Sequence, residues 1–249
     1  MLRRIGAGTQ MVETELRELF PEAGILRMDT DTVTPAGSHE KLLDRFREEG
    51  IPIMVGTQMV TKGLNFENVT LVGVISADQS LYAGDYRAGE RTFSLITQVV
   101  GRSGRGAKPG RAVIQTFTPD NEIIVRAAGQ DYPAFYRAEI ELRKLQRTPP
   151  FSEMLSVTVS GTDEEHVYRA CRAVRQRLDG LLSADGRAEI LGPAPLAVVR
   201  INNRYRYRVT ICGAPGGGLR PVVAGVVMEC CRDRRFSDVS IYADNDPGE

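Results

Sequence analysis

The chain has 249 residues, of which 42% are hydrophobic, and its 32 basic residues equal its 32 acidic residues in number. These figures are typical of an ordinary soluble globular protein, and the balanced charge excludes an overall attraction to nucleic acid, so any polyanion site must be a local patch. No apolar run is long enough to span a membrane, and the four cysteines show no Cys-x-x-Cys spacing. We therefore expect a cytoplasmic chain with reduced thiols and without a zinc site of its own.

The first two-thirds of the chain alternate helix and strand patterns. Helical stripes begin at Gly6–Thr9, at Ser38 and before Phe93, and the second of them stops at Gly50. Apolar strands are predicted at 25–28, 51–55, 69–75 and 112–117. This alternation predicts a parallel sheet with helices on both faces, and the strand at 69–75 is apolar enough to be covered on both sides.

The pattern changes after a predicted helix at 133–146. Thr148-Pro149-Pro150 ends that helix, and we place a domain boundary there. The elements that follow are a strand at 154–159, a helix at 164–182, strands at 190–201 and 204–212, a helix at 219–231 and a strand at 239–242. The order βαββαβ predicts a ferredoxin-like plan. We therefore predict an α/β domain over 1–147 and a smaller α+β domain over 148–249.

The segment "QVVGRSGRG", 98–106, combines Gln98 with Arg102 and Arg105 at a glycine-loosened helix end. In nucleoside-triphosphate hydrolysis, negative charge spreads over the γ-phosphoryl oxygens of the transition state, and an inserted arginine stabilises it. A lone Arg-x-x-Arg is commonly a solvated helix face. Together with Gln98 and three glycines, the pair favours a catalytic interpretation.

The segment "GTQMVTKGLNF", 56–66, lies between two predicted strands, at the carboxyl end of the first. Ligands of open α/β sheets collect at such ends. Thr57 and Gln58 can hydrogen-bond a nucleic-acid backbone there, and Gly63 permits close approach of a ribose or phosphate. The turn at 6–9 offers free amides as a phosphate seat, or it is a tight turn with Thr9 as helix cap.

Two segments imitate chemistry that we reject. "GRSGRGAK" lacks the Gly-Lys-Ser/Thr ending of a phosphate loop. "DEEH", 163–166, imitates the acidic Mg²⁺ box of a helicase, but Thr162 with Glu165 fits a helix capping box. His39 and His166 are predicted to be solvated surface groups.

The run "RYRYR", 204–208, alternates, so a strand would place three arginines on one face and two tyrosines on the other. Arg204 and Arg206 could then follow phosphates while Tyr205 stacks on a base. Equally, the tyrosines could belong to the core and the arginines to the solvent. The pattern leaves both interpretations open.

These segments, in this order, resemble the second motor lobe of a superfamily 2 helicase: 56–66 resembles motif V and 98–106 resembles motif VI. "DYRAGER" at 85–91, "LQRTPPF" at 145–151 and "LGPAP…YRYR" at 191–208 resemble more narrowly the primosomal protein N′ (PriA) family of replication-restart helicases. The resemblance implies a RecA-like second helicase lobe, followed by a carboxyl-terminal domain likened to ribosomal protein S10. "DYRAGER" and the ferredoxin-like second domain disfavour another superfamily 2 translocase such as an RNA helicase.

The resemblance also implies a DNA-dependent ATPase that moves 3′ to 5′, recognises stalled forks and helps to reload the replicative helicase. ATP with Mg²⁺ would be the cofactor. Arg102 and Arg105 would contact the γ-phosphate, with Arg105 as the finger. By the same resemblance, Gly63 and Asn65 would face the nucleotide, although position 65 is often aspartate in the family. The DNA contacts implied or suggested above are Thr9, Thr57, Gln58, Lys62, Arg204, Tyr205 and Arg206.

The resemblance covers only the carboxyl half of that family. The first motor lobe with its phosphate loop, an amino-terminal DNA-binding region and most of a zinc-binding segment would precede Met1. We therefore expect no ATP hydrolysis by this chain alone. The partners implied are forked and single-stranded DNA, single-stranded DNA-binding protein (SSB), other primosome proteins and the first lobe. The alternative is a stand-alone, non-catalytic module that binds DNA or SSB.

Overall fold

The computed structural model describes residues 8–29, 38–57, 69–101, 110–182 and 186–247. The chain divides into two compact units, Met1–Tyr136 and Arg137–Glu249. Within the described ranges, no helix has both the length and the apolar character that a membrane crossing requires.

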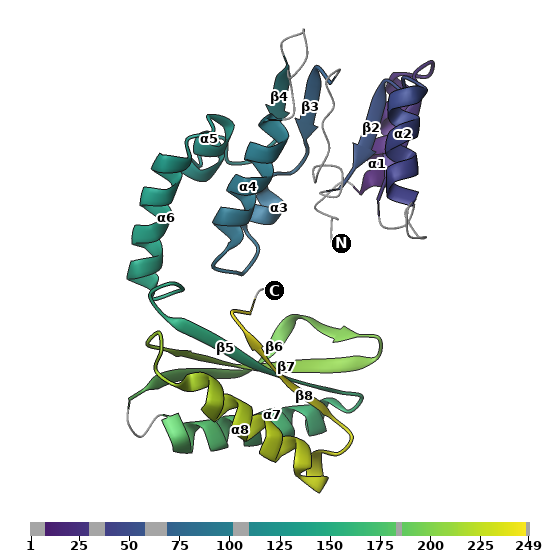
Figure 1. Ribbon diagram of the computed structural model, residues 1–249. Helices are drawn as coiled ribbons and strands as arrows, with labels where there is room; N and C mark the ends of the chain where they lie inside the picture. Colours follow the sequence, from purple (N-terminus) through teal and green to yellow (C-terminus); the bar gives the residue numbers. More distant parts are fainter. Residues whose placement is uncertain (1–7, 30–37, 58–68, 102–109, 183–185, 248–249) are drawn as a thin grey trace. The chain divides into compact units, whose positions relative to one another are not determined.

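The first unit opens with a parallel pair of strands, β1 (Ile25–Met28) and β2 (Ile53–Gly56), accompanied by helices α1 (Thr9–Leu19) and α2 (Ser38–Glu48) (Figure 1). Buried Met28 and Leu43 form the core of this part. The predicted strand at 25–28 is confirmed residue for residue. The chain turns after α2 at Gly50, whose φ of 63° is a left-handed conformation that favours glycine.

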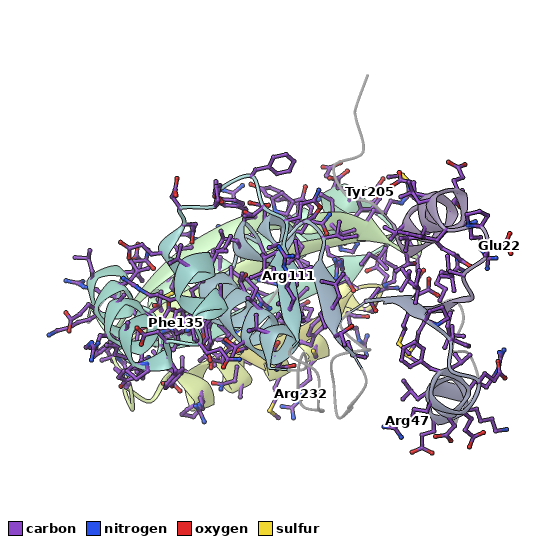
Figure 2. The ribbon with its side chains drawn as sticks, turned by 90° about the horizontal axis from the view of Figure 1, so that it is seen from above. Glu22, Arg47, Arg111, Phe135, Tyr205 and Arg232 are labelled. Carbon is purple, nitrogen blue, oxygen red and sulfur yellow. The ribbon has the colours of Figure 1, made fainter. Side chains whose placement is uncertain are left out.

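A second parallel pair consists of β3 (Leu71–Val74) and β4 (Arg111–Ile114). The accompanying helices are α3 (Asp78–Leu81), α4 (Ala88–Val100), α5 (Glu122–Ala128) and the start of α6 (Tyr132–Gln146), a helix that continues past Tyr136 into the second unit. Phe93 of α4 and Phe135 of α6 stack with ring centroids 4.2 Å apart, inside a cluster that includes Ile96 and Ile124. Phe135 is labelled in Figure 2. Parallel strands with helices between them confirm the α/β class of this unit. Helices α3 and α5 were not predicted, because each is too short to show a helical period.

The prediction that the strand at 69–75 is covered on both faces is wrong for the described residues. Val74 and Ile114 pack against the core around Phe93. On the opposite face of the same two strands, Leu71 is 61% exposed and Val113 is 48% exposed. An apolar strand favours burial of both its faces, but the described residues bury only one face of this strand pair.

The second unit is a four-stranded antiparallel sheet with two helices. Its elements are β5 (Glu153–Gly161), α7 (Glu164–Leu182), β6 (Ala188–Ile201), β7 (Arg204–Gly213), α8 (Leu219–Arg232), the short 3₁₀ helix η2 (Arg234–Phe236) and β8 (Ser240–Asn245). The strand order is β6-β7-β5-β8, and α7 and α8 lie side by side along one face (Figure 1). This order and connectivity confirm the ferredoxin-like βαββαβ plan.

The alternation of side chains along the strands separates the two faces of this sheet. Val157 and Val159 of β5 and Val209 and Ile211 of β7 are fully buried against α7 and α8. The residues between them therefore point to the face without helices, which we call the open face. It carries Ser156, Thr158, Ser160, Arg204, Arg206, Arg208 and Tyr242.

Helix α7 begins differently from the capping box predicted at Thr162. The Asp163 carboxylate accepts the backbone N–H of His166 at 2.7 Å, because Asp163 directly precedes the first helical residue. His166 is also not the solvated group that we predicted. Its two ring nitrogens lie 2.8 Å from an oxygen of Asp238 and 2.9 Å from the carbonyl oxygen of Arg235.

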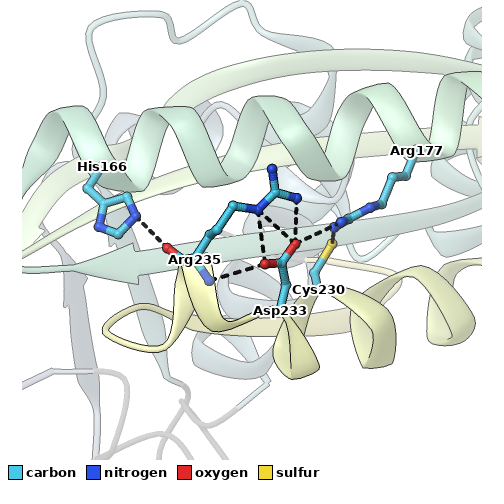
Figure 3. Close-up of polar contacts among 5 residues, drawn as sticks. All are labelled: His166, Arg177, Cys230, Asp233 and Arg235. Carbon is cyan, nitrogen blue, oxygen red and sulfur yellow. Dashed lines mark hydrogen bonds and ion pairs between the residues drawn. The ribbon is translucent and has the colours of Figure 1, made fainter.

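Arginines around one carboxylate connect α7 with the end of α8 (Figure 3). Asp233 accepts hydrogen bonds from the Arg235 guanidinium at 2.7 Å and from the Arg177 guanidinium at 3.0 Å. The hydrogen bonds from the side chain and backbone of Arg235, with that from Arg177, hold the pKa of Asp233 far below its usual range. The charged carboxylate is therefore the form that this part of the fold stabilises.

Replacing Asp233 by asparagine should lower the melting temperature at neutral pH, and the difference from wild type should disappear in acid. A carboxyl whose pKa is lower in the folded state contributes stability above its unfolded pKa of about 3.9, and that stability is lost as the pH falls further toward the folded pKa. Thermal melts between neutral pH and strong acid measure this. Asp120→Asn, in an exposed turn, is the control for the loss of one carboxylate and should leave the melting temperature at neutral pH nearly unchanged. A difference between Asp233→Asn and wild type that persists in acid would contradict the assignment.

Candidate functional site

Helix α4 carries the first residue of the predicted catalytic motif. Phe93, Ile96 and Val99 are buried, whereas Gln98 lies on the exposed side of the helix, two residues before its end. Arg102 and Arg105 follow directly in the sequence but lie outside the described residues. The fold therefore presents Gln98 away from the core, where a ligand or another domain can reach it.

The opposite end of α4 is held by "DYRAGER". The Asp85 carboxylate accepts the backbone N–H of Arg87 at 2.9 Å and a hydrogen bond from the Arg91 guanidinium, and the Asp85 side chain is only 2% exposed. The backbone N–H of Ala88 donates to the Asp85 carbonyl at 2.9 Å. Asp85 thus satisfies free N–H groups at the helix start. Sequence reasoning identified this segment by resemblance but missed its structural role.

Gly101 ends α4, and its surroundings are restricted. A Cβ atom there would lie 3.2 Å from the Thr97 carbonyl oxygen and 3.4 Å from Nε2 of Gln130. A side chain at this position would press on the last turn of the helix and on the α5–α6 loop. Glycine therefore lets the chain leave α4 closely packed, directly before Arg102.

The predicted motif V begins at the carboxyl end of β2. Thr57 directly follows the strand and is exposed, in agreement with a ligand-facing position at the end of a parallel strand. Gln58, Lys62, Gly63 and Asn65 lie outside the described residues. Only Thr57 of this set can therefore be placed.

Thr9 has a partner that the sequence did not suggest. Its hydroxyl donates a 2.5 Å hydrogen bond to the carboxylate of Asp29, which is buried just beyond β1. Arg27 lies 3.3 Å from the same carboxylate. Gly8, the residue before α1, has no side chain to cap the helix, and Thr9 ties the helix start to the end of β1. A carboxylate beside this helix start lowers its attraction for phosphate.

A carboxylate that sequence reasoning missed joins the carboxyl ends of β3 and β4. Asp78 accepts hydrogen bonds from the Thr116 hydroxyl at 2.8 Å, the Phe117 N–H at 3.0 Å and the Thr118 hydroxyl at 3.1 Å. Desolvation opposes its ionisation, but these hydrogen bonds outweigh it and hold the pKa of Asp78 below its usual range. Its partners lie 38 to 40 residues away in the sequence, so no local signal reveals the cluster.

The open face of the second unit carries the predicted arginines. Arg204 donates to the Ser160 carbonyl at 2.8 Å and to the Ser240 hydroxyl at 3.0 Å, and Arg206 donates to the Val198 carbonyl at 2.7 Å. Among the described residues, no carboxylate lies within 4.0 Å of Arg204, Arg206 or Arg208. Arginines on the helices of this unit, such as Arg175 and Arg177, do have carboxylate partners. Within the described part of the chain, the charges of these three arginines are therefore not neutralised by ion pairs.

The two tyrosines of "RYRYR" lie on the helix side of β7, as the alternation predicts. Tyr207 packs against the core, meets the ring of Tyr168 edge-on at 5.6 Å and donates to Glu164 at 2.9 Å. That hydrogen bond raises the pKa of Tyr207. The Arg200 guanidinium covers the ring of Tyr205 at 5.0 Å. The structure thus brings Arg204 and Arg206 together and places Tyr205 on the other face.

Comparisons with known proteins match both units. Residues 6–107 match the model of the helicase conserved C-terminal domain, and residues 144–247 match that of the primosomal protein N C-terminal domain. The replication restart protein PriA of Bacillus subtilis is 45% identical over 246 residues, which are 99% of this chain and 30% of that protein. The PriA proteins of Synechocystis and Chlamydia trachomatis are 37% and 40% identical, over 98% and 83% of this chain and 28% and 27% of their own lengths.

Proposed function

The chain belongs to the family of the replication restart protein PriA, and from this premise we propose that it forms the carboxyl-terminal part of an ATP-dependent DNA helicase that assembles the primosome at stalled forks. The chain spans about 30% of the length of the Bacillus subtilis relative, so the proposed helicase activity also requires parts that these 249 residues do not contain. We propose movement in the 3′ to 5′ direction and a cytoplasmic location as parts of the same function.

In this proposal the first unit of the chain supplies one half of an ATP site, which is built around α4. Arg105 is the arginine finger, Arg102 contacts the γ-phosphate beside it, and Gln98 supports both. Gly63 and Asn65 face the nucleotide. Bound ATP with Mg²⁺ supplies the triphosphate whose developing charge the arginines stabilise. Thr57, Gln58 and Lys62 contact the DNA backbone. Thr9, whose hydroxyl donates to Asp29, is proposed as a further DNA contact.

The observation that supports this proposal best is the construction of α4. Asp85 holds the start of the helix, the stack of Phe93 on Phe135 holds its middle, and Gln98 is exposed just before the two arginines. A helix anchored in this way holds Gln98 in a defined position, and such preorganisation is what electrostatic catalysis requires of the groups that surround a reacting phosphate.

The experiment that tests the proposal measures DNA-stimulated ATP hydrolysis by a chimera in which this chain replaces the matching 246 residues of the Bacillus subtilis protein. We expect hydrolysis by the chimera and none by the 249 residues alone, because their sequence contains no Gly-x-x-x-x-Gly-Lys-Ser/Thr phosphate loop. A folded chimera without activity would count against the assignment.

The open face favours a second candidate function, a non-catalytic module that binds single-stranded DNA. Three arginines on one strand face, without carboxylate neighbours among the described residues, form a local patch that attracts polyanions although the net charge of the chain is zero. Binding of SSB or of other primosome proteins by this unit belongs to the same proposal. The two candidate functions are compatible, since a DNA-binding second unit could act together with a helicase lobe in the first unit.

Replacing both Arg204 and Arg206 by glutamine should weaken binding of single-stranded DNA and make it less dependent on salt. For each phosphate that the variant no longer neutralises, the slope of log affinity against log salt should become shallower by about 0.7. The control is the double variant Arg172→Gln and Arg232→Gln, which removes the same charge from exposed positions on α7 and α8. Fluorescence anisotropy at several salt concentrations measures both. Equal losses in the two double variants would show a general charge effect and contradict the patch.

A further inference from the structure

The open face holds an aromatic residue that sequence reasoning did not single out. Tyr242 of β8 is 47% exposed, whereas its neighbour Ile241 is buried in the core beneath the sheet. Since successive residues of a strand point to opposite faces, the Tyr242 side chain stands on the open face with the arginines. Tyr205 and Tyr207, by contrast, lie on the face that the helices cover.

The register of three strands places Tyr242 in one row with an arginine. Thr158 of β5 pairs with Arg208 of β7 on one side and with Tyr242 of β8 on the other. Residues paired across antiparallel strands share a face, and strands lie about 4.8 Å apart, so the backbones of Arg208 and Tyr242 are roughly 10 Å apart. Between them, Thr158 is only 3% exposed, so this short side chain forms the floor between two long ones.

The neighbouring rows show where charge changes along this face. Arg206, Ser160 and Ser240 form the next row on one side, and Thr210, Ser156 and Asp244 form the next row on the other. Arginines thus occupy one half of the face, and a carboxylate begins the other half. A polyanion is attracted to the arginine half and repelled from the row of Asp244, which leaves Tyr242 at the boundary.

We infer that Tyr242 is the base-stacking residue of a single-stranded DNA site on the open face, and that Arg204, Arg206 and Arg208 of β7 hold the phosphates. This inference rests on the proposed binding of DNA by the second unit and names its aromatic contact. Single-stranded DNA has a negative backbone that arginines bind and flat bases that a tyrosine ring can stack on. The buried Ser160 and Thr158 side chains form the floor between these long side chains.

The absence of tryptophan from the sequence allows a direct test. Tyr242→Trp introduces a single indole, whose fluorescence should be quenched when the chain binds a single-stranded oligonucleotide of about 16 nucleotides. An abasic oligonucleotide of the same length keeps the phosphates and should leave the fluorescence unchanged. Tyr168→Trp is the matched control, because Tyr168 is similarly exposed, at 42%, but lies on α7.

Affinity provides the second measurement. Tyr242→Ala should weaken binding of the base-carrying oligonucleotide by about 5- to 30-fold, in the range of one stacked base. It should hardly change binding of the abasic one, and Tyr242→Phe should bind both as the wild type does. Circular dichroism of each variant verifies that the fold is retained.

The possible failures are distinguishable. If the wild-type chain binds no oligonucleotide, both this inference and the DNA-binding role of the second unit are overturned. If glutamines at 204 and 206 weaken binding while Tyr242→Ala does not and the indole is not quenched, the role stands and Tyr242 is not its stacking residue. Equal weakening of both oligonucleotides by Tyr242→Ala would likewise overturn a stacking role.

Discussion

Replacing Arg105 by alanine should lower DNA-stimulated ATP hydrolysis of the chimera by about 10³-fold or more, the range known for arginine fingers. The guanidinium is needed most when charge has accumulated on the phosphoryl oxygens. Its loss should therefore reduce kcat far more than it weakens binding of ATP. Steady-state kinetics separates the two effects, and binding of a non-hydrolysable ATP analogue provides an independent measure of affinity.

The control for this prediction is Arg111→Ala. Arg111 is an exposed arginine at the start of β4, only six positions beyond Arg105 in the sequence (Figure 2). It should retain wild-type turnover, because it begins a strand and lies outside the predicted motif. DNA affinity should be unchanged in both variants. Undiminished turnover of Arg105→Ala would remove the finger from the proposed mechanism.

Replacing Leu178 by alanine should lower the free energy of unfolding of the second unit by about 3 kcal/mol, within the usual range for a buried leucine. Leu178 lies on α7, is fully buried and packs in the cluster that joins both helices to the sheet. The substitution removes apolar contacts and leaves a cavity, and close-packed surroundings relax only in part. Chemical denaturation followed by circular dichroism measures the loss.

Leu181→Ala provides the matched control, because the same substitution on the same helix changes a side chain that is 50% exposed. Its cost should be well below that of Leu178→Ala, since little apolar surface is returned to water. Equal costs at the two positions would mean that α7 does not turn Leu178 into the core. The same result would question the assignment of the opposite sheet face as open.

Elements with strong local patterns could be predicted closely. The strand at 25–28 and the helix at 164–182 have the bounds that periodicity indicated, and β5, β6, β7 and β8 were each found within a few residues. Apolar period is a local property, because it reflects which side of one element is covered. Exposed Leu71 shows the limit of this reasoning: an apolar strand predicts a need for cover and does not reveal which element provides it.

The sequence by itself determined the class of both units, the family resemblance and the alternation that separates Arg204 and Arg206 from Tyr205. These follow from residue order, since neighbours in a strand or helix have fixed relative directions. Only the tertiary structure decided that Asp78 joins two strand ends and that Tyr242 shares a row with Arg208. These pairings join residues tens of positions apart, so they depend on strand order and register, which arise only when whole elements pack together.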